Sequence, residues 1–535
     1  MSNANRFGVM LDMSRNAVMK LSELKEFAKL LQAFGYNMIQ LYTEDTYEVD
    51  DEPYFGHLRG RYSKAELKEF VDYCDTLGME VIPCIQTLAH LNQIFHHKKY
   101  LAINDVTDIL LAGDERTYAL IENMFKTVRQ VFKSEYIHIG MDEAHLLGAG
   151  KYLARNGYES RFEILSKHLA RVIEIARKYE LRPMMWSDMY FRIANHGPYQ
   201  TLNDVITDEI VATCPDGVEL VYWDYYQDNK AVYDNMILQH KKFHKPTWFA
   251  GGAWSWKGFA PFNRWSIDTM RLAIESCAEH GVDNVFFTMW GDNGKECSYW
   301  SLLPALFAFR KIYDGVTDEE VMKAQFKEVT GEDFDAMMAL DLPNQVAPYD
   351  GRWSTVSKTM LYNDPLLGIY DRSVNEEAPA QYAEFAKTLR AYGKDSAYAY
   401  LFEYEAALCE LLSVKYDLGV RARAAYKKGD KQALQNILGD IDRAGELLEA
   451  FYRTFKTVWM KENKPFGFEV QDIRLGGLQF RLRAAKETIA AYVNGESDRI
   501  EEFDEPVLDP GEPGTAGKAP IINQYNKIAT PSVLG

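Results

Sequence analysis

Asp142 and Glu143 are adjacent carboxylic acids in the segment His138-Ile-Gly-Met-Asp-Glu-Ala144. Most glycosidases place two carboxyl groups on either side of the scissile bond, about 5–5.5 Å apart for retention and about 6.5–9.5 Å apart for inversion. Consecutive residues enter a site from one side, because their α-carbons are only about 3.8 Å apart. The pair is better suited to a sugar whose own 2-acetamido group is the nucleophile. Glu143 would then protonate the departing oxygen, while Asp142 holds and polarises the acetamido group.

Polar and aromatic residues also follow other apolar runs of the N-terminal half. They are Arg15, His90, Trp186, Trp223, Tyr225, Trp254, Trp290 and Asp292. Flat aromatic rings stack on the apolar C–H faces of a sugar, and charged groups hydrogen-bond to its hydroxyls. The joint pattern therefore predicts a carbohydrate site.

The elements that must position these residues are eight short apolar runs, which alternate with amphipathic segments from residue 7 to about residue 315. The runs are Phe7–Leu11, Met38–Tyr42, Glu80–Ile85, Tyr136–Ile139, Pro183–Trp186, Val218–Trp223, Thr247–Ala250 and Asn284–Met289. Apolar strands that are each followed by a helix predict a parallel sheet buried on both faces. Eight repeats favour an α/β fold of the closed (β/α)8 TIM-barrel type, whose active sites lie at the carboxyl ends of the strands.

The chain changes character at about residue 316, where the strands stop. Helical periodicity with charged outer faces is found in Glu319–Val329, Ala378–Tyr392, Tyr398–Tyr426, Lys431–Met460 and Leu478–Val493. We therefore expect a catalytic barrel in residues 1–315 and a mostly α-helical C-terminal domain in residues 316–503. Residues 504–535 are rich in Pro and Gly, which predicts an extended or poorly ordered tail.

The overall composition is that of an ordinary globular chain, with 47% hydrophobic and 26% charged residues and a formal net charge of −18. That charge repels nucleic acid and anionic membrane surfaces, so neither is expected as a partner. No apolar run reaches the roughly 20 residues of a membrane-spanning helix, and no signal peptide is visible. The six cysteines form no CxxC pair, which predicts free thiols in a reducing cytoplasm.

The segment His138–Ala144 closely resembles the signature of glycoside hydrolase family 20, the β-N-acetylhexosaminidases. The similarity extends over residues 7 to about 315 and includes Leu11-Asp-Met-Ser-Arg15, Arg61-Tyr-Ser-Lys64, Ala89-His90 and Met289-Trp-Gly-Asp292. It implies an exo-acting retaining enzyme that removes terminal GlcNAc, GalNAc or both from glycans through an oxazolinium intermediate. It also implies that the enzyme needs no metal and no organic cofactor.

The resemblance further implies a role for each matching residue. Glu143 would be the general acid/base, and Asp142 would orient the acetamido group. Arg15 would bind the non-reducing-end hydroxyls, with Trp290 and Asp292 completing that end of the pocket. The remaining residues would line the sugar or support the acid/base pair: Trp186, Trp223, Trp254 and His90.

Several positions depart from the family pattern. The segment Pro83–His90 lacks the usual acidic residues and the Gly before the His, and Asp292 stands where a Glu is common. The tyrosine that would bond the acetamido oxygen has no clear match, and Tyr225 is our substitute. The family's common N-terminal α/β domain has no counterpart before the first strand. We therefore expect a divergent branch.

Two other functions stay open on the sequence. A retaining glycosidase with a direct carboxylate nucleophile could use Glu143 with Asp188 or Asp292, and would need no acetamido group on its substrate. A non-catalytic sugar-binding barrel is the other alternative. The aromatic, turn-rich segment Trp459–Phe468 also leaves open a homodimer in which it reaches a neighbouring active site.

Overall fold

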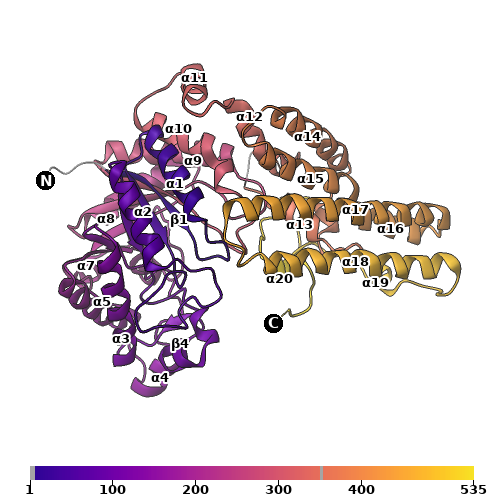
Figure 1. Cartoon of the computed structure of the whole chain (residues 1–535). Helices are drawn as coiled ribbons and strands as arrows, with labels where there is room; N and C mark the ends of the chain where they lie inside the picture. The colour runs from indigo at the N-terminus through magenta and orange to yellow at the C-terminus, as the bar shows by residue number, and fades with distance from the viewer. Residues whose placement is uncertain (1–5, 350–352, 535) are drawn as a thin grey trace. The chain divides into compact units, whose positions relative to one another are not determined.

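The computed structural model describes residues 6–349 and 353–534, and eight parallel strands close into a barrel (Figure 1). Around the barrel the order is β1-β10-β9-β8-β7-β6-β3-β2. The strand bounds are β1 Arg6–Asp12, β2 Met38–Tyr42, β3 Glu80–Cys84, β6 Tyr136–His138, β7 Arg182–Trp186, β8 Glu219–Trp223, β9 Thr247–Gly252 and β10 Asn284–Met289. The predicted (β/α)8 barrel is confirmed, and each predicted strand agrees with an observed one to within two residues at either end.

Amphipathic helices follow the strands and pack on the outside of the barrel. They are α1 Leu21–Phe34, α2 Lys64–Thr76, α3 Glu115–Val131, α5 Arg161–Lys178, α8 Lys230–Lys241, α9 Asn263–Glu279 and α10 Leu303–Tyr313. Their ends follow from local chemistry. Ser63 and Glu66 form a capping box at the start of α2, and Gly35 ends α1 in the left-handed conformation with φ 97°.

Short elements interrupt the loops at the carboxyl ends of three strands. The hairpin of β4 (Asn104–Val106) and β5 (Ile109–Leu110) follows β3, and α4 (Lys151–Asn156) follows β6. Two further short helices, α6 (Asp188–Ala194) and α7 (Asp208–Ala212), follow β7. None was predicted, because elements of two to seven residues are too short to establish a periodic pattern.

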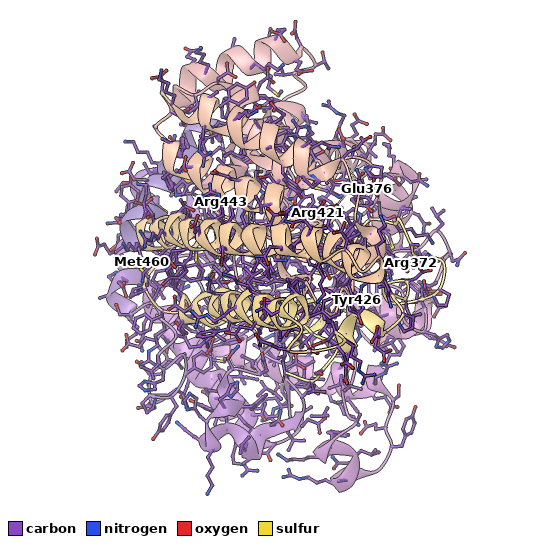
Figure 2. All side chains as sticks on the ribbon, turned by 90° about the vertical axis from the view of Figure 1, so that its right-hand side faces the viewer. Arg372, Glu376, Arg421, Tyr426, Arg443 and Met460 are labelled. Carbon is purple, nitrogen blue, oxygen red and sulfur yellow. The ribbon has the colours of Figure 1, made fainter. Side chains whose placement is uncertain are left out.

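The second compact unit is helical, as predicted. Its helices are α11 Glu319–Thr330, α12 Phe334–Met338, α13 Val356–Tyr362, α14 Ala378–Gly393, α15 Ala399–Lys415, α16 Leu418–Lys427, α17 Lys431–Glu462, α18 Glu469–Asn494, α19 Glu501–Asp504 and α20 Tyr525–Ile528. The long helices α17 and α18 lie side by side (Figure 1). An ion pair joins α16 to α17, because Nη1 of Arg421, labelled in Figure 2, lies 2.6 Å from Oδ2 of Asp440.

The two compact units are not continuous in sequence. The barrel unit comprises Met1–Ala253, Ser266–Trp290 and Leu306–Glu319, whereas the segments Trp254–Trp265 and Gly291–Ala305 cluster with the helical residues from Glu320 onward. Within the helical unit, the C-terminal tail makes contacts with the residues around α13. The backbone N–H of Thr355 donates to the carbonyl of Pro520 at 2.7 Å, and Ile528 is fully buried.

Two features bear on the environment of the chain. Among the helices of the described ranges, none combines the length and the hydropathy that crossing a bilayer requires. All six cysteines lie in the described ranges, where they are buried thiols outside any disulfide.

Candidate active site

The loop after β6 carries Asp142 and Glu143 on a tightly wound backbone. Gly140, Met141 and Glu143 have φ angles of 71°, 72° and 51°. Left-handed conformations are uncommon for residues other than glycine and persist only where the surroundings hold them. At Gly140 a β-carbon would lie 2.0 Å from Oε1 of Gln86, so no larger residue fits there. The same oxygen accepts a hydrogen bond from the backbone N–H of Met141 at 3.1 Å.

Asp142 is buried and held from two sides. Gln86 donates from Nε2 to Oδ1 of Asp142 at 2.8 Å, and Nε2 of His90 lies 3.2 Å from Oδ2. Burial alone would raise the pKa of the Asp142 carboxyl, but the charge of His90 and these hydrogen bonds lower it below its ordinary value. Burial lowers the pKa of His90, and the Asp142 carboxylate more than compensates, raising it to about 10. The two residues therefore form an ion pair at neutral pH.

The hairpin after β3 fixes His90. The backbone N–H of His90 donates to Oδ2 of Asp108 at 2.9 Å, and His90 itself adopts a left-handed φ of 58°. Asp108 lies in the turn between β4 and β5. An unpredicted element thus positions one of the predicted residues.

Glu143 faces solvent beside its buried neighbour, since its side chain is 41% exposed. Its Oε2 lies 3.8 Å from Nε2 of His90, and its Oε1 accepts from Nη2 of Arg192 at 3.3 Å. Its backbone N–H donates to Oδ2 of Asp188 at 3.1 Å. Asp188 is fully buried, and burial together with the Asp142 charge raises its pKa. The adjacent carboxyl groups of Asp142 and Glu143 therefore have contrasting environments, as different catalytic roles require.

Arg15 is fixed at the end of β1 by charge and by aromatic rings. Its Nη1 lies 3.1 Å from Oδ2 of Asp12, and its Nη2 lies 3.3 Å from Oε1 of Glu44. The guanidinium carbon is 5.2 Å from the ring centre of Tyr42 and 5.4 Å from that of Trp290. This geometry suits a cation that binds hydroxyl groups from a fixed position.

Trp290, beside Arg15, and three other predicted aromatic residues connect the end of β1 to the ends of other strands. The indole N–H of Trp290 donates to the hydroxyl of Tyr225 at 3.1 Å, and the Tyr225 ring stacks on that of Trp223 with centroids 5.6 Å apart. Trp290 also lies 6.1 Å from Trp186, which is buried against His138. The rings form a continuous wall over the carboxyl ends of β7, β8 and β10.

The barrel unit thus brings together eight of the ten predicted site residues, namely Arg15, His90, Asp142, Glu143, Trp186, Trp223, Tyr225 and Trp290. Trp254 and Asp292 belong to the helical unit. Trp254 is fully buried there and stacks on Trp256 with ring centroids 4.5 Å apart. Burial lowers the pKa of Lys257 in the same unit, and the charge of Asp292 opposes that shift. The sugar-binding roles of Trp254 and Asp292 stay predictions.

Sequence reasoning missed Gln86, Glu44 and Arg192. Each follows a barrel strand, and that position was the sequence signal that could have identified it. However, Gln, Glu and Arg side chains are also common on protein surfaces, so the residue type did not distinguish them. The four-residue spacing of Asp188 and Arg192 on α6 was a further clue, because it places an acid and a base on one helix face.

One group of acidic and imidazole side chains in the described residues has ligand atoms close enough together to hold a metal ion. It consists of Asp234, Glu279 and His280. Nζ of Lys230 lies 2.9 Å from Asp234 and 2.7 Å from Glu279, so an ammonium group already balances this charge. The cluster shares no residue with the site at the strand ends.

Comparison with known families identifies the family of both regions of the chain. A family model described as "Glycosyl hydrolase family 20, catalytic domain" matches residues 6–232, and one described as "Glycoside Hydrolase 20C C-terminal domain" matches residues 332–518. The chain belongs to glycoside hydrolase family 20. The resemblance drawn from the sequence motifs is therefore confirmed, and family membership extends to the helical region of this glycoside hydrolase.

Characterised relatives of this family 20 protein include two called Hexosaminidase D. The Bos taurus protein is 28% identical over 261 residues, which are 46% of this chain and 69% of the relative. The Homo sapiens protein is 29% identical over 242 residues, covering 42% of this chain but only 46% of the relative. A solved Vibrio harveyi exo-β-N-acetylglucosaminidase of family 20, in complex with N-acetylglucosamine, aligns over 63% of this chain and 58% of its own, with 14% identity and a TM-score of 0.47.

Proposed function

We propose that this family 20 hydrolase is an exo-acting, retaining β-N-acetylhexosaminidase that removes terminal GlcNAc, GalNAc or both from glycans. The observation that carries the proposal is the contrast between the two neighbouring acids. Asp142 is buried and paired with His90 at 3.2 Å, whereas the Glu143 side chain is 41% exposed. A buried charged acid suits the acetamido group, and an accessible acid suits the leaving group and water.

The first chemical step would use the sugar's own nucleophile. The acetamido oxygen attacks C1, the bond from C1 to the leaving oxygen breaks, and the Glu143 carboxyl transfers its proton to that oxygen. Asp142 accepts a hydrogen bond from the acetamido N–H, and its negative charge stabilises the oxazolinium ion. The ion pair with His90 keeps Asp142 charged throughout.

The second step would return the enzyme to its starting state. The Glu143 carboxylate takes a proton from water, the water oxygen attacks C1, and the ring bond between C1 and the acetamido oxygen breaks. Each step inverts the configuration at C1, so the product retains the original configuration. No second carboxylate nucleophile is needed.

The substrate class follows from the residues around this pair. Arg15, held by Asp12 and Glu44, would bind the hydroxyls of a non-reducing-end sugar. The rings of Trp223, Tyr225 and Trp290 would face its apolar side. The names of the Hexosaminidase D relatives agree with this class. The buried, unpaired cysteines support our proposal that the chain works in a reducing compartment.

Paired assays test the proposal. We expect turnover of an aryl N-acetyl-β-glucosaminide or N-acetyl-β-galactosaminide and little turnover of the matching aryl β-glucoside. A thiazoline mimic of the bicyclic intermediate should inhibit tightly and bind with its nitrogen against Asp142. Strong glucoside turnover without turnover of the N-acetyl substrate would favour a direct carboxylate nucleophile. Binding of N-acetylglucosamine without any hydrolysis would favour a sugar-binding barrel.

A further inference from the structure

Asp188 and Arg192 hold Glu143 by its backbone and by its side chain at once. Oδ2 of Asp188 accepts from the backbone N–H of Glu143 at 3.1 Å and from Nε of Arg192 at 3.0 Å. Nη2 of the same guanidinium donates to Oε1 of Glu143 at 3.3 Å. These three hydrogen bonds close a ring that begins and ends on Glu143.

Asp188 and Arg192 are more buried than the Glu143 side chain that they hold. Asp188 is fully buried at the start of α6, and the Arg192 side chain is 17% exposed. The guanidinium carbon of Arg192 lies 5.8 Å from the ring centre of Tyr199 and 5.7 Å from that of Trp223. A planar guanidinium that packs on aromatic rings presents its N–H donors in a fixed fork geometry. The Glu143 carboxyl is the most exposed member of the ring.

The proposed reaction needs Glu143 in two protonation states. It must carry a proton to protonate the leaving oxygen and must be ionised to activate water. An arginine donor stabilises the ionised carboxylate more than the protonated carboxyl, because only the carboxylate adds a charge to the hydrogen bond. The contact with Arg192 therefore favours the form of Glu143 that serves the second step.

We infer that Asp188 and Arg192 form a clamp that returns Glu143 to its carboxylate form and holds it for the attack of water, which makes Arg192 a positioning residue for the second half-reaction. This inference rests on the proposed function. In the free enzyme the clamp holds the Glu143 carboxylate. It releases this group when the group gains a proton, and it re-forms after that proton has passed to the leaving oxygen.

Other charged groups around Glu143 affect the same equilibrium. His90 lies 3.8 Å away on the loop after β3, Asp142 is its neighbour in sequence, and His145 lies on the same loop. The positive charge of His90 acts in the same direction as Arg192, and the Asp142 and Asp188 carboxylates oppose both. Arg192 is nonetheless the residue that donates a hydrogen bond to the Glu143 carboxylate directly.

The test uses the Arg192→Gln and Arg192→Lys variants of the full chain. Loss of the guanidinium makes proton loss from Glu143 harder, so the alkaline limb of kcat/KM for an aryl N-acetyl-β-glucosaminide should move up by about half to one pH unit in Arg192→Gln. Arg192→Lys keeps the charge and should restore most of that shift. Hydrolysis of preformed GlcNAc oxazoline, which needs only the base, should fall about tenfold in Arg192→Gln at a pH below neutrality.

Arg161→Gln is the matched control. Arg161 donates to the backbone carbonyl of His145 on the same loop at 3.1 Å and not to the Glu143 carboxyl, so both the pH profile and the oxazoline turnover of Arg161→Gln should match the wild type. An alkaline limb of Arg192→Gln that coincides with the wild type and with Arg161→Gln would overturn the clamp. So would an unchanged rate of oxazoline hydrolysis.

A thermal double-variant cycle separates the clamp from the proposed function. The Tm losses of Arg192→Gln and Glu143→Gln should be smaller in combination than their sum, because each variant removes the same contact. Additive losses would count against the clamp whatever the activity. A wild-type protein that hydrolyses no N-acetylhexosaminide would overturn the proposed function, while the cycle would still report whether Arg192 holds Glu143.

Discussion

Gln86 reaches from the end of β3 to Asp142 on the loop after β6 and donates a hydrogen bond to its carboxylate at 2.8 Å. The same amide nitrogen donates to the hydroxyl of Tyr42 at 3.0 Å, and the amide oxygen accepts from Met141. One neutral side chain therefore links three strand ends and fixes the direction of the Asp142 carboxylate. It occupies the segment in which the family pattern led us to expect acidic residues.

Replacement of Gln86 by methionine should slow catalysis. The Gln86→Met change keeps the side-chain length but removes a hydrogen bond to a charged acceptor, which is worth about 1.5–3 kcal/mol. We expect kcat for an aryl N-acetyl-β-glucosaminide to fall roughly 10- to 100-fold. Gln40→Met is the matched control, because Gln40 is an equally buried barrel glutamine with no hydrogen bond to Asp142. Equal losses in the two variants would show that Gln86 acts only through packing.

The Glu143→Gln variant should show a loss that depends on the leaving group. General acid catalysis contributes about 10²- to 10⁴-fold, and this loss should appear in full with a poor leaving group such as a methyl glycoside. A dinitrophenyl leaving group departs without a proton, so its release should suffer far less. Steady-state and burst kinetics on the two substrates measure the difference. An equal loss on both would contradict the acid role.

The Asp142→Asn variant should lose rate even with the dinitrophenyl substrate. The acetamido group remains the nucleophile in that reaction, and the oxazolinium charge then has no buried carboxylate beside it. We expect kcat to fall by roughly 10²-fold or more on both classes of leaving group. A leaving-group dependence like that of Glu143→Gln would contradict the separate roles of the two acids.

The ion pair of His90 with Asp142 should make the stability of the folded protein fall as the pH rises into the alkaline range. His90 has its pKa raised from 6.5 to about 10, so its protonated form is favoured in the folded state. The stability that this provides is fully present below pH 6.5 and is lost as the pH rises towards 10. The Tm of the wild type should therefore fall between pH 6.5 and 10 more steeply than that of His90→Gln. The exposed His57→Gln variant, as control, should follow the wild type.

The Tyr225→Phe variant tests which tyrosine serves the acetamido oxygen. Its hydroxyl accepts a hydrogen bond from Trp290 at 3.1 Å, and a phenolic O–H group can accept one hydrogen bond and donate another. We expect a fall in kcat of about tenfold with N-acetyl substrates, the value of one hydrogen bond formed in the transition state. Unchanged kcat with raised KM would mean that Tyr225 only lines the pocket.

The barrel was predictable because its strands are apolar on both faces and regularly spaced, as in Met38–Tyr42 and Asn284–Met289. The adjacent acids and most of their neighbours were predictable because barrel sites lie at strand ends. A helix was expected after each strand, but the bounds of α8 were not predicted, since the polar residues Gln239 and His240 are buried in it and obscure the amphipathic pattern. One continuous helix was predicted over Tyr398–Tyr426, but the chain breaks between α15 and α16, where Asp417 leaves the helical conformation with φ −109°.

The network around the site was harder to predict, because it depends on contacts between distant loops. Gln86 and Asp142 are 56 residues apart, and Glu143 and Arg192 are 49 apart. A single sequence carries no signal that pairs such positions. The hairpin of β4 and β5 was missed for a related reason, since its two short strands matter through the hydrogen bond of Asp108 to His90.

The close approach of the Gln86 amide to Gly140 limits how this enzyme can be redesigned. A methyl group there would collide with the amide of Gln86, so positions 86 and 140 behave as a single unit of variation. A mutagenesis library that enlarges residue 140 while it keeps Gln86 should therefore return few active clones. Libraries that change both positions together, with a smaller side chain at 86, could instead alter how Asp142, the proposed acetamido-binding acid, is held.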